Sequence, residues 1–389
     1  MSRTALVIFV TLTRQSLFLL TERRVSVTSV TASFRHSAAN AARPLIGLVA
    51  AFAALCPAAF QAAHTAALAQ ALQAPAVVGA AVDIPGVVKG GTPIERILTG
   101  YDGLDDPIGL TDGTLVFSEP GARRLHRMNT RTNEVSVLVA DSNESHGATE
   151  DARGRLISAQ AWDGSTRIGV IYPPESRAVL ADTYEGRPFS RPNDLIVARN
   201  GGVYFTDPGL TVQQAEALVK RLGKPLEPRL PPAVYYIPAG GRAIRIEDRM
   251  IRPNGIQLSR DEKTLYVSDS NGSDIVAWDI QPDGLVRNRR AFGSLTGRSP
   301  RDNGLGGIRT FADGMTIDND GRLYVATGGG VEVLNEQGRR LGTIPVRCPP
   351  ADCQNIAFGG PGKRTLYVGG AGSLYKVETV ARGFAGRPK

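Results

Sequence analysis

A short strand-like pattern recurs six times in the last three hundred residues, and it limits the folds open to this chain. Each copy starts at an apolar residue, and successive copies start 41, 47, 62, 58 and 43 residues apart. The starting residues are Leu115, Leu156, Val203, Leu265, Leu323 and Leu366. A strand repeat of about 40 to 50 residues is typical of a β-propeller, in which each repeat forms one blade. The sequence therefore predicts an all-β fold, a six-bladed β-propeller, and the 44 Gly and 25 Pro suit its many turns.

A polar residue stands ten or eleven positions before each of these starts. In chain order they are Asp105, His146, Asn193, Asn254, Asp313 and Asn355. A turn should carry each polar residue into the innermost strand of its blade, so the six side chains should meet at one mouth of the central channel. Asn and Asp before Gly are also common turn residues. A purely structural turn is therefore the alternative for the pairs 146–147, 254–255 and 313–314.

The predicted ring holds two carboxylates, three amides and one imidazole. Oxygen ligands without thiolates or paired imidazoles suit Ca²⁺ or Mg²⁺, and Ca²⁺ takes about 6 to 8 oxygen ligands. Such an ion polarises a carbonyl or phosphoryl oxygen and makes a bound water more acidic. With a nearby carboxylate as general base, the ring predicts hydrolysis of an ester-like bond. The chain has no G-x-S-x-G sequence, which argues against a serine hydrolase elbow.

The longest interval between two starts, 203–265, contains an insertion. Val212, Ala215, Leu218 and Leu222 follow helical spacing and predict a short helix over 211–222. A proline-rich stretch follows it. Because the insertion leaves the end of a second strand, we expect it at the same mouth, either as a lid over the site or as a peripheral decoration.

The N-terminal part of the chain has the features of an export signal. Arg43 precedes an apolar run from Pro44 to Phe60, and small residues around 67–69 resemble a cleavage site. We therefore expect a signal or leader segment over 1–69, a linker over 70–92 and the propeller over 93–385. A mature protein of this kind would be periplasmic or secreted and free of the membrane, with an uncleaved anchor as the alternative.

The net charge limits the classes of molecule that the domain is expected to bind. The whole chain has a net charge of +8, but 1–69 hold six Arg and one Glu, so the remaining 39 basic and 36 acidic residues give only +3. A nearly neutral domain argues against nucleic acid as a partner and leaves a small-molecule substrate. No feature indicates an oligomeric state.

Cys348 and Cys353 could form a disulfide in an oxidising compartment or remain free thiols.

Several motifs together resemble the gluconolactonase / senescence marker protein (regucalcin) family. They are Arg191-Pro192-Asn193-Asp194 with the strand 203–208, Arg252-Pro253-Asn254-Gly255 with the strand 265–269, and Ala312-Asp313-Gly314-Met315. The resemblance covers about residues 94 to 380. It implies a six-bladed propeller with a divalent metal, often calcium, in its channel. It also implies lactonase activity, or the phosphotriesterase-like activity of some relatives.

The resemblance also implies roles for individual residues. Asn254 and Asp313 would bind the metal, with Asp313 also acting as the base, and Asn193 would face metal or substrate. Arg191 would contact the substrate, and His146 is expected in the polar wall around it. The family has Glu in its first-blade motif, whereas this chain has Asp105, which is one methylene shorter and is expected to be the fourth metal ligand.

We therefore expect a hydrolase that opens a sugar lactone or similar ester, with Ca²⁺ favoured and Mg²⁺, Mn²⁺ or Zn²⁺ as other candidates. One alternative is a non-catalytic propeller, a scaffold or ligand-binding module, which the change at Asp105 would favour. Another is a metal-free relative resembling strictosidine synthase, against which the presence of Asn254 and Asp313 argues.

Overall fold

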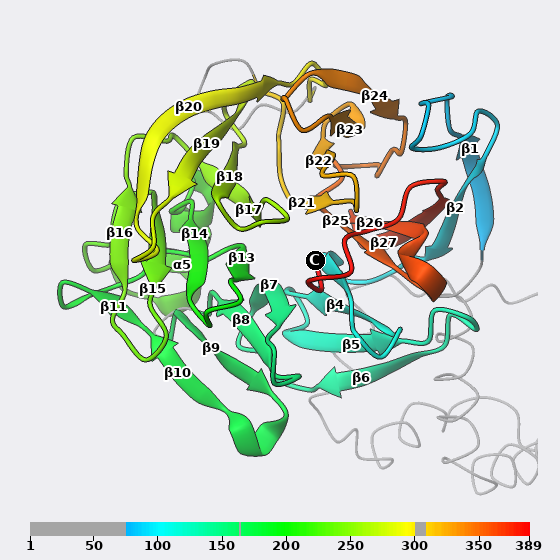
Figure 1. Cartoon of the computed structure of the whole chain (residues 1–389). Coiled ribbons are helices and arrows are strands. Elements are labelled where there is room, and N and C mark those ends of the chain that lie inside the picture. Colours follow the sequence, from blue (N-terminus) through cyan, green and yellow to red (C-terminus); the bar gives the residue numbers. More distant parts are fainter. Residues whose placement is uncertain (1–74, 163–164, 300–308) are drawn as a thin grey trace, which may run out of the picture. The chain divides into compact units, whose positions relative to one another are not determined.

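The computed structural model describes residues 75–162, 165–299 and 309–389. They form six antiparallel sheets arranged radially around one axis (Figure 1), which confirms the predicted six-bladed β-propeller. From the axis outwards, blades one to three are β3 (Asp105–Gly109), β4 (Leu115–Glu119), β5 (Arg124–Met128) and β6 (Val135–Val139); β7 (Ser145–Glu150), β8 (Leu156–Gln160), β9 (Arg167–Tyr172) and β10 (Ala178–Ala181); and β13 (Leu195–Val197), β14 (Val203–Asp207), β15 (Ala233–Ile237) and β16 (Ile244–Glu247).

The remaining blades follow the same plan. Blades four and five are β17 (Pro253–Leu258), β18 (Thr264–Asp269), β19 (Asp274–Ile280) and β20 (Val286–Ser294); and β21 (Met315–Ile317), β22 (Leu323–Thr327), β23 (Gly330–Leu334) and β24 (Arg340–Ile344). Blade six is β25 (Asn355–Gly359), β26 (Thr365–Gly370), β27 (Ser373–Glu378), β2 (Pro93–Leu98) and β1 (Ala76–Ala80). Short elements between them are the hairpin β11 (Thr183–Tyr184) and β12 (Arg187–Pro188) and the 3₁₀ turns η2 (Pro174–Ser176) and η3 (Pro361–Lys363).

Blade six joins the two ends of the propeller. Its inner three strands come from the end of the sequence, whereas β2 and β1 come from the beginning, and β2 pairs with β27. We expected a linker over 70–92, but part of it, β1, is a strand. Its small and β-branched residues pair with the outer edge of β2, which would otherwise present unpaired backbone groups. The signal segment expected over 1–69 lies outside the described residues.

The core lies between neighbouring blades. Alternate residues of β14 point to opposite faces of blade three, so Phe205 packs toward blade two and Tyr204 toward blade four. On one face Phe205 stacks on Tyr235 with ring centroids 5.0 Å apart, and on the other Tyr204 stacks on Tyr236 at 4.5 Å. Both faces of β14 are thus buried, and the packing holds blade three between its two neighbours.

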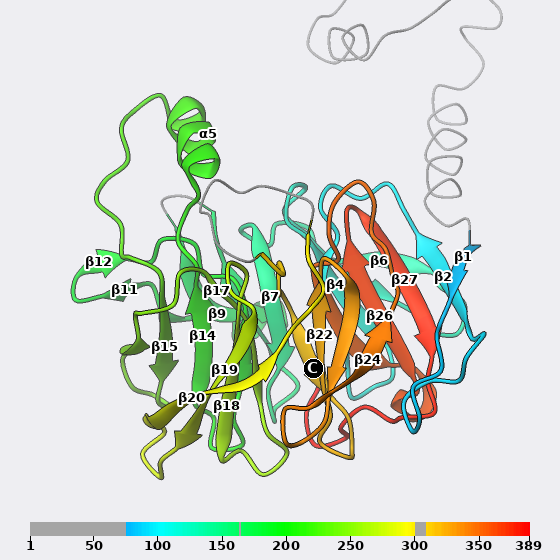
Figure 2. The same cartoon turned by 90° about the horizontal axis from the view of Figure 1, so that it is seen from above.

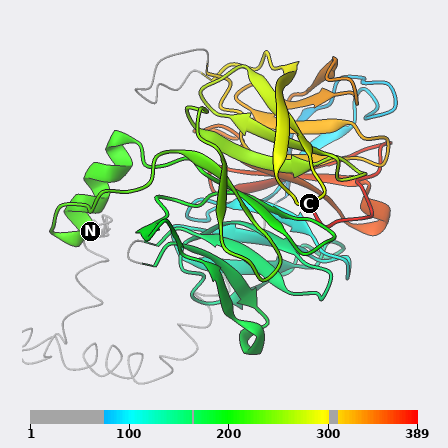
Figure 3. The same cartoon turned by 60° about the vertical axis from the view of Figure 1, so that its left-hand side comes forward.

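The predicted inserted helix is present as α5 (Val212–Leu222). Thr211 caps its N-terminus in a capping box with Gln214, and Gly223 ends it in the left-handed conformation at φ +66°. Figures 2 and 3 show α5 standing clear of the blades on one face of the propeller. Among the described helices, none combines the length and the apolar character needed to cross a bilayer.

Cys348 and Cys353 form a disulfide with their α-carbons 5.1 Å apart. The bridge closes a small loop directly before β25, and both cysteines are buried. The expectation of a disulfide is confirmed, and that of two free thiols is wrong.

Candidate functional site

The six polar residues of the repeat lie at or just before the start of an innermost strand. In chain order they are Asp105 at the start of β3, His146 in β7, Asn193 before β13, Asn254 in β17, Asp313 before β21 and Asn355 at the start of β25. The innermost strands of successive blades contact one another all around the axis. The structure therefore brings the predicted ring together at one end of the channel, which we call the mouth.

Glycines follow three ring residues because neighbouring innermost strands approach closely there. His146-Gly147 and Asn254-Gly255 lie inside β7 and β17, so the turn interpretation is wrong for them. A β-carbon on Gly255 would lie only 2.1 Å from the Asp313 carbonyl oxygen. Glycine thus allows Asn254 and Asp313 to lie side by side.

Asn254 offers the ring an oxygen that nothing in the described chain satisfies. Its Nδ2 donates to Ser270 Oγ at 2.9 Å, and this hydroxyl donates to the carbonyl of Ala312 at 3.0 Å. This network fixes the amide orientation and leaves Asn254 Oδ1 buried without a hydrogen-bond partner among the described residues. Such an oxygen costs about 1–3 kcal/mol unless a donor or cation meets it.

Asp313 belongs to the neighbouring blade, its backbone packs against Gly255, and part of its surface is exposed. Desolvation by the surrounding protein raises the pKa of Asp313 well above its ordinary value of 3.8, and the carboxylates of Asp105 and Asp194 raise it further. Arg252 and Lys389 oppose this rise. A divalent ion bound at the mouth would act in the opposite sense to this rise and favour the ionised carboxylate.

A polar chain holds Asp105 and His146 in place. Asp105 Oδ1 accepts from the Asp106 N–H at 2.8 Å, and its Oδ2 lies 3.5 Å from His146 Nδ1. Arg191 donates to His146 Nε2 at 2.6 Å and to Glu144 Oε1 at 3.1 Å. Because a guanidinium only donates, His146 Nε2 is the acceptor and the ring proton lies on Nδ1, toward Asp105. Nε2 of His146 is therefore not free for a metal.

The other two amides of the ring differ in what they offer. Asn355 Oδ1 accepts from the Ile356 N–H at 2.9 Å, so this oxygen is already used. Asn193 is held by its backbone, which accepts from the Gly147 N–H at 2.7 Å. Its side chain is partly exposed and makes no hydrogen bond within the described residues, so it can turn toward a cation or a substrate.

Carboxylates at the ends of the second strands hold the loops that carry the ring. Asp207 accepts from the backbone N–H groups of Ser190 and Arg191 at 2.6 and 2.8 Å. Asp269 accepts in the same way from the backbone N–H groups of Ile251 and Arg252, at 3.0 and 3.1 Å. Burial raises the pKa of Asp207 to about 6, although these N–H groups oppose the rise. The two carboxylates thus have a structural task at the mouth.

The insertion is attached to the mouth through Arg221 of α5. Its guanidinium lies 3.7 Å from Glu144 Oε2 and stacks over Trp162 at 4.1 Å, and Arg123 stacks over the same ring at 4.0 Å. Because Glu144 also pairs with Arg191, the helix is connected to the residues of the ring. This arrangement favours a lid over a peripheral decoration.

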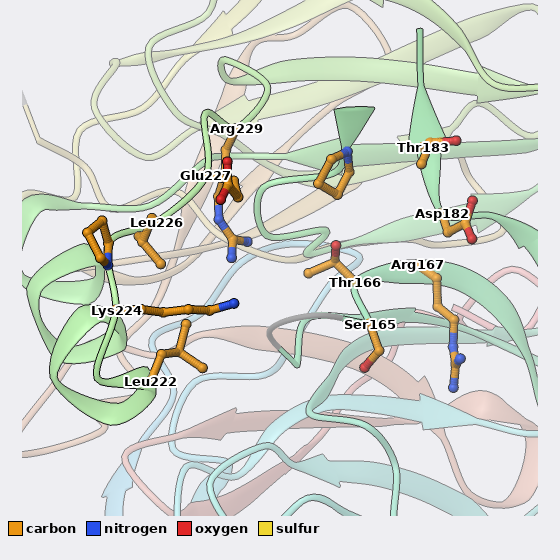
Figure 4. A pocket seen from close by; sticks show the side chains of 12 residues that line it. Ser165, Thr166, Arg167, Asp182, Thr183, Leu222, Lys224, Leu226, Glu227 and Arg229 are labelled. Carbon is orange, nitrogen blue, oxygen red and sulfur yellow. The ribbon is translucent and has the colours of Figure 1, made fainter. Parts of the chain in front are cut away.

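A cavity of about 430 Å³ lies between the end of α5 with the residues that follow it and the start of β9 in blade two with the hairpin β11–β12 (Figure 4). Lys224, Glu227 and Arg229 line it from the insertion, Arg167 lines it from β9, and Asp182 lines it from the residue before β11. No ring residue belongs to its lining, so it is separate from the polar chemistry of the mouth.

Sequence reasoning missed Glu144 and a second charged layer below the ring. Glu144 has no counterpart in the other repeats, and it adopts an unusual left-handed conformation at φ +54°. The second layer pairs Asp106 and Asp194 with Lys389. Each of these aspartates directly follows a ring residue, so the same repeat phase could have identified them, whereas no pattern indicated Lys389.

The donor chemistry of the ring fits a hard divalent cation. Within 75–162, 165–299 and 309–389, no three His, Cys, Asp or Glu side chains form a ready-made metal cluster. The ring instead combines Asn254 Oδ1, the Asp313 carboxyl group, Asp105 Oδ2 and the open Asn193 amide. Two carboxylates with neutral amide oxygens suit Ca²⁺ or Mg²⁺ better than metals that prefer sulfur or nitrogen.

Comparisons with known proteins cover most of the propeller. The family model "SMP-30/Gluconolactonase/LRE-like region" matches residues 109–372. The gluconolactonase of Zymomonas mobilis is 30% identical over 312 residues, which are 75% of this chain and 83% of that protein. Regucalcin of Sus scrofa is 26% identical over 67% of this chain and 80% of its own. A solved gluconolactonase structure from Xanthomonas campestris has 29% identity and a TM-score of 0.63, covering 78% of this chain and 97% of that one.

Proposed function

Because the chain belongs to the SMP-30/gluconolactonase/LRE-like family, we propose that it hydrolyses the ring ester of a sugar lactone at a divalent-cation site in the mouth of its channel. The relatives from Zymomonas mobilis and Xanthomonas campestris bear the name gluconolactonase. The observation that carries the proposal is the buried Oδ1 of Asn254, which has no hydrogen-bond partner among the described residues, on a strand that packs against the backbone of Asp313. A buried oxygen of this kind needs a donor or a cation.

Four residues of the ring would hold the cation: Asp105, Asn193, Asn254 and Asp313. Calcium is the favoured ion because the donors are carboxylate and amide oxygens, and Mg²⁺, Mn²⁺ and Zn²⁺ are the other candidates. When bound, a divalent ion polarises a carbonyl oxygen and acidifies water.

The chain's own residues would orient the lactone and move the proton. Arg191, held by Glu144 and His146, would donate hydrogen bonds to the oxygens of the lactone. Asn193 and His146 would position the hydroxyl groups of the lactone. The Asp313 carboxylate would accept a proton from the water that attacks the carbonyl carbon. As the ring C–O bond breaks, this proton would go to the departing ring oxygen, and the product is the open hydroxy acid.

Asp105 sets the first-blade side of the site. Its Oδ1 is used by the Asp106 N–H, so only Oδ2 is directed at the mouth. Compared with the Glu of the family motif, its reach is shorter by one methylene. We propose that a water bridges Asp105 to the cation, which lowers the affinity for the cation without removing the site.

We also propose that the protein works in the periplasm or outside the cell. The Cys348–Cys353 disulfide supports this, because disulfides persist in oxidising compartments and are rare in the cytosol. Measuring the free thiols of the protein isolated from each compartment, with and without reduction, tests this proposal.

The central experiment follows the hydrolysis of glucono-lactone by acid release, corrected for the spontaneous rate, before and after the metal is removed. We expect activity to vanish on chelation and to return with one of Ca²⁺, Mg²⁺, Mn²⁺ or Zn²⁺. Asp313→Ala should abolish turnover while urea unfolding stays cooperative, whereas Asp320→Ala, an exposed residue of the same blade, should retain it. Metal binding without turnover would favour a ligand-binding propeller, and activity that survives chelation would contradict the metal site.

A further inference from the structure

The last described residues enter the channel from the end opposite to the mouth. Strand β17 runs from the mouth at 253–254 to its far end at Leu258. There Arg387 donates to the Leu258 carbonyl at 2.6 Å and pairs with Glu262 at 2.9 Å. Gln257 donates to the carbonyl of Lys389 at 3.3 Å. Figure 1 shows this segment reaching the centre of the ring of blades. The contacts thus deliver the side chain of Lys389 onto the channel axis.

The ammonium group of Lys389 lies in a cage of oxygen atoms. Its Nζ is 3.1 Å from Asp106 Oδ1, contacts Asp194 Oδ1 directly, and lies 3.4 Å from the Leu195 carbonyl oxygen. The lysine side chain is fully buried, and both aspartate side chains are 1% exposed. Asp106 Oδ1 accepts no other hydrogen bond in the described chain. Two carboxylates and a peptide carbonyl around one buried charge are the ligand types that a hard cation takes.

This charged layer also connects the strands that carry the ring. The second oxygen of Asp106 accepts from the Ala148 N–H and so links β3 to β7. The second oxygen of Asp194 accepts from the Ile256 N–H at 3.1 Å and so links the start of blade three to β17. Without a cation between them, the two buried carboxylates would repel each other, and removing one partner of a buried charged pair is strongly destabilising.

Lys389 meets the requirements of that cation. Its ammonium group pairs with both carboxylates at once and so places one positive charge between them. Unlike a free ion, it is attached to the chain and held by the contacts of Arg387.

We propose that the Lys389 ammonium fills a second cation position in the channel, below the ring, as a tethered equivalent of a structural metal ion. The two aspartates at this position directly follow the ring residues Asp105 and Asn193 in the sequence. The wild-type protein therefore needs no free ion there. It follows that shortening Lys389 opens a site for Ca²⁺, made of two carboxylates, one peptide carbonyl and water in the vacated space.

The test compares two variants of the full chain. Lys389→Ala removes the charge and makes room, whereas Lys389→Met removes the charge but keeps the volume. Bound Ca²⁺ per chain is measured by equilibrium dialysis, and unfolding is followed with and without Ca²⁺. We expect Lys389→Ala to bind one more Ca²⁺ per chain than the wild type and to depend on Ca²⁺ for its stability. Lys389→Met should lose stability and gain no ion.

Equal Ca²⁺ stoichiometry in Lys389→Ala and the wild type would overturn the proposal. Because the readout is a difference between the two proteins, it holds even if the wild-type ring binds no ion and the proposed function fails. If Lys389→Ala folds in neither condition, the neutral triple variant Lys389→Met, Asp106→Asn, Asp194→Asn decides. The triple variant should have a higher unfolding free energy than Lys389→Met alone, because it buries no uncompensated carboxylate. An equal or lower unfolding free energy would show that Lys389 does not serve to compensate the two carboxylates.

Discussion

Replacing Gly255 by Ala tests whether the ring depends on the close approach of its innermost strands. The added β-carbon would lie 2.1 Å from the Asp313 carbonyl oxygen, 2.8 Å from the Asp313 carbonyl carbon and 2.9 Å from the Gly314 α-carbon. Contacts of a real β-carbon hardly ever fall below 3.0 Å. The strands must therefore separate by about 0.9 Å at this point, because backbone atoms on both sides cannot rotate away.

Two effects of different size should follow from this separation. Forcing an extra carbon into packed backbone costs about 1–3 kcal/mol of unfolding free energy, and we expect the upper part of that range because three backbone atoms are in the way. Asn254 and Asp313 would also move apart by nearly the same distance. A displacement of about 1 Å among reacting groups can lower a rate by about 100-fold. We expect a loss of this order in kcat/KM and a weaker response of stability to Ca²⁺.

Two other glycines provide matched controls. A β-carbon on Gly79 in β1 would make only an ordinary contact, at 3.7 Å from Ile94, so Gly79→Ala should change neither stability nor rate. Gly113 has φ +84° and no atom near its added carbon. Gly113→Ala should therefore cost about 1–2 kcal/mol through its left-handed backbone but keep its activity. Urea unfolding and lactone hydrolysis measure both quantities, and a Gly255→Ala protein that matches Gly79→Ala would refute the reasoning.

Three further predictions concern the lid, the pH response and the disulfide. Arg221→Ala should raise KM with little change in kcat or stability. The variant loses only a half-exposed ion pair and a contact with the Trp162 ring worth about 0.5–1 kcal/mol. Steady-state kinetics measures KM and kcat, and an unchanged KM would argue against a lid. The folded-state pKa of Asp313 is raised above its ordinary value of 3.8, so the metal-free fold should lose stability as pH rises from there toward the raised pKa, and Ca²⁺ binding should release a proton. Denaturation with and without Ca²⁺ across this pH range measures the stability, and calorimetry in two buffers measures the proton release. If the stability gained from Ca²⁺ does not change with pH, the assignment of Asp313 is contradicted. Cys348→Ser with Cys353→Ser should lower the unfolding free energy by about 2 kcal/mol, the entropy of a six-residue loop, as read from urea unfolding against the parent protein.

The sequence was sufficient for the features that repeat in register. The phase of the polar residues placed Asn254 and Asp313 at the start of innermost strands, because the strand pattern after each of them is local and regular. The helix α5 was predictable for the same reason, since its spacing and its cap lie within twelve residues. The glycine after Asn254 was ambiguous, because close approach between two blades and a local turn both favour Gly.

Features that depend on distant contacts could not be predicted. Glu144 gained its place through Arg191, 47 positions away, and has no equivalent in the other blades. Lys389 reaches Asp194 across 195 positions, and no periodic pattern marks its segment. The pairing of β2 with β27 likewise joins the two ends of the propeller, so the alternation within β2 could indicate a strand but not its neighbour.

The joining of β2 to β27 has a consequence for the order of assembly. Ile94 pairs with Val377, so a strand that is made early must wait for a partner made 283 residues later. Until the two strands pair, β2 has no neighbour on that side and blade six presents an open edge to other chains. Contacts this distant in sequence make folding slow, so closure of blade six is the step at which a folding chain is most exposed to aggregation.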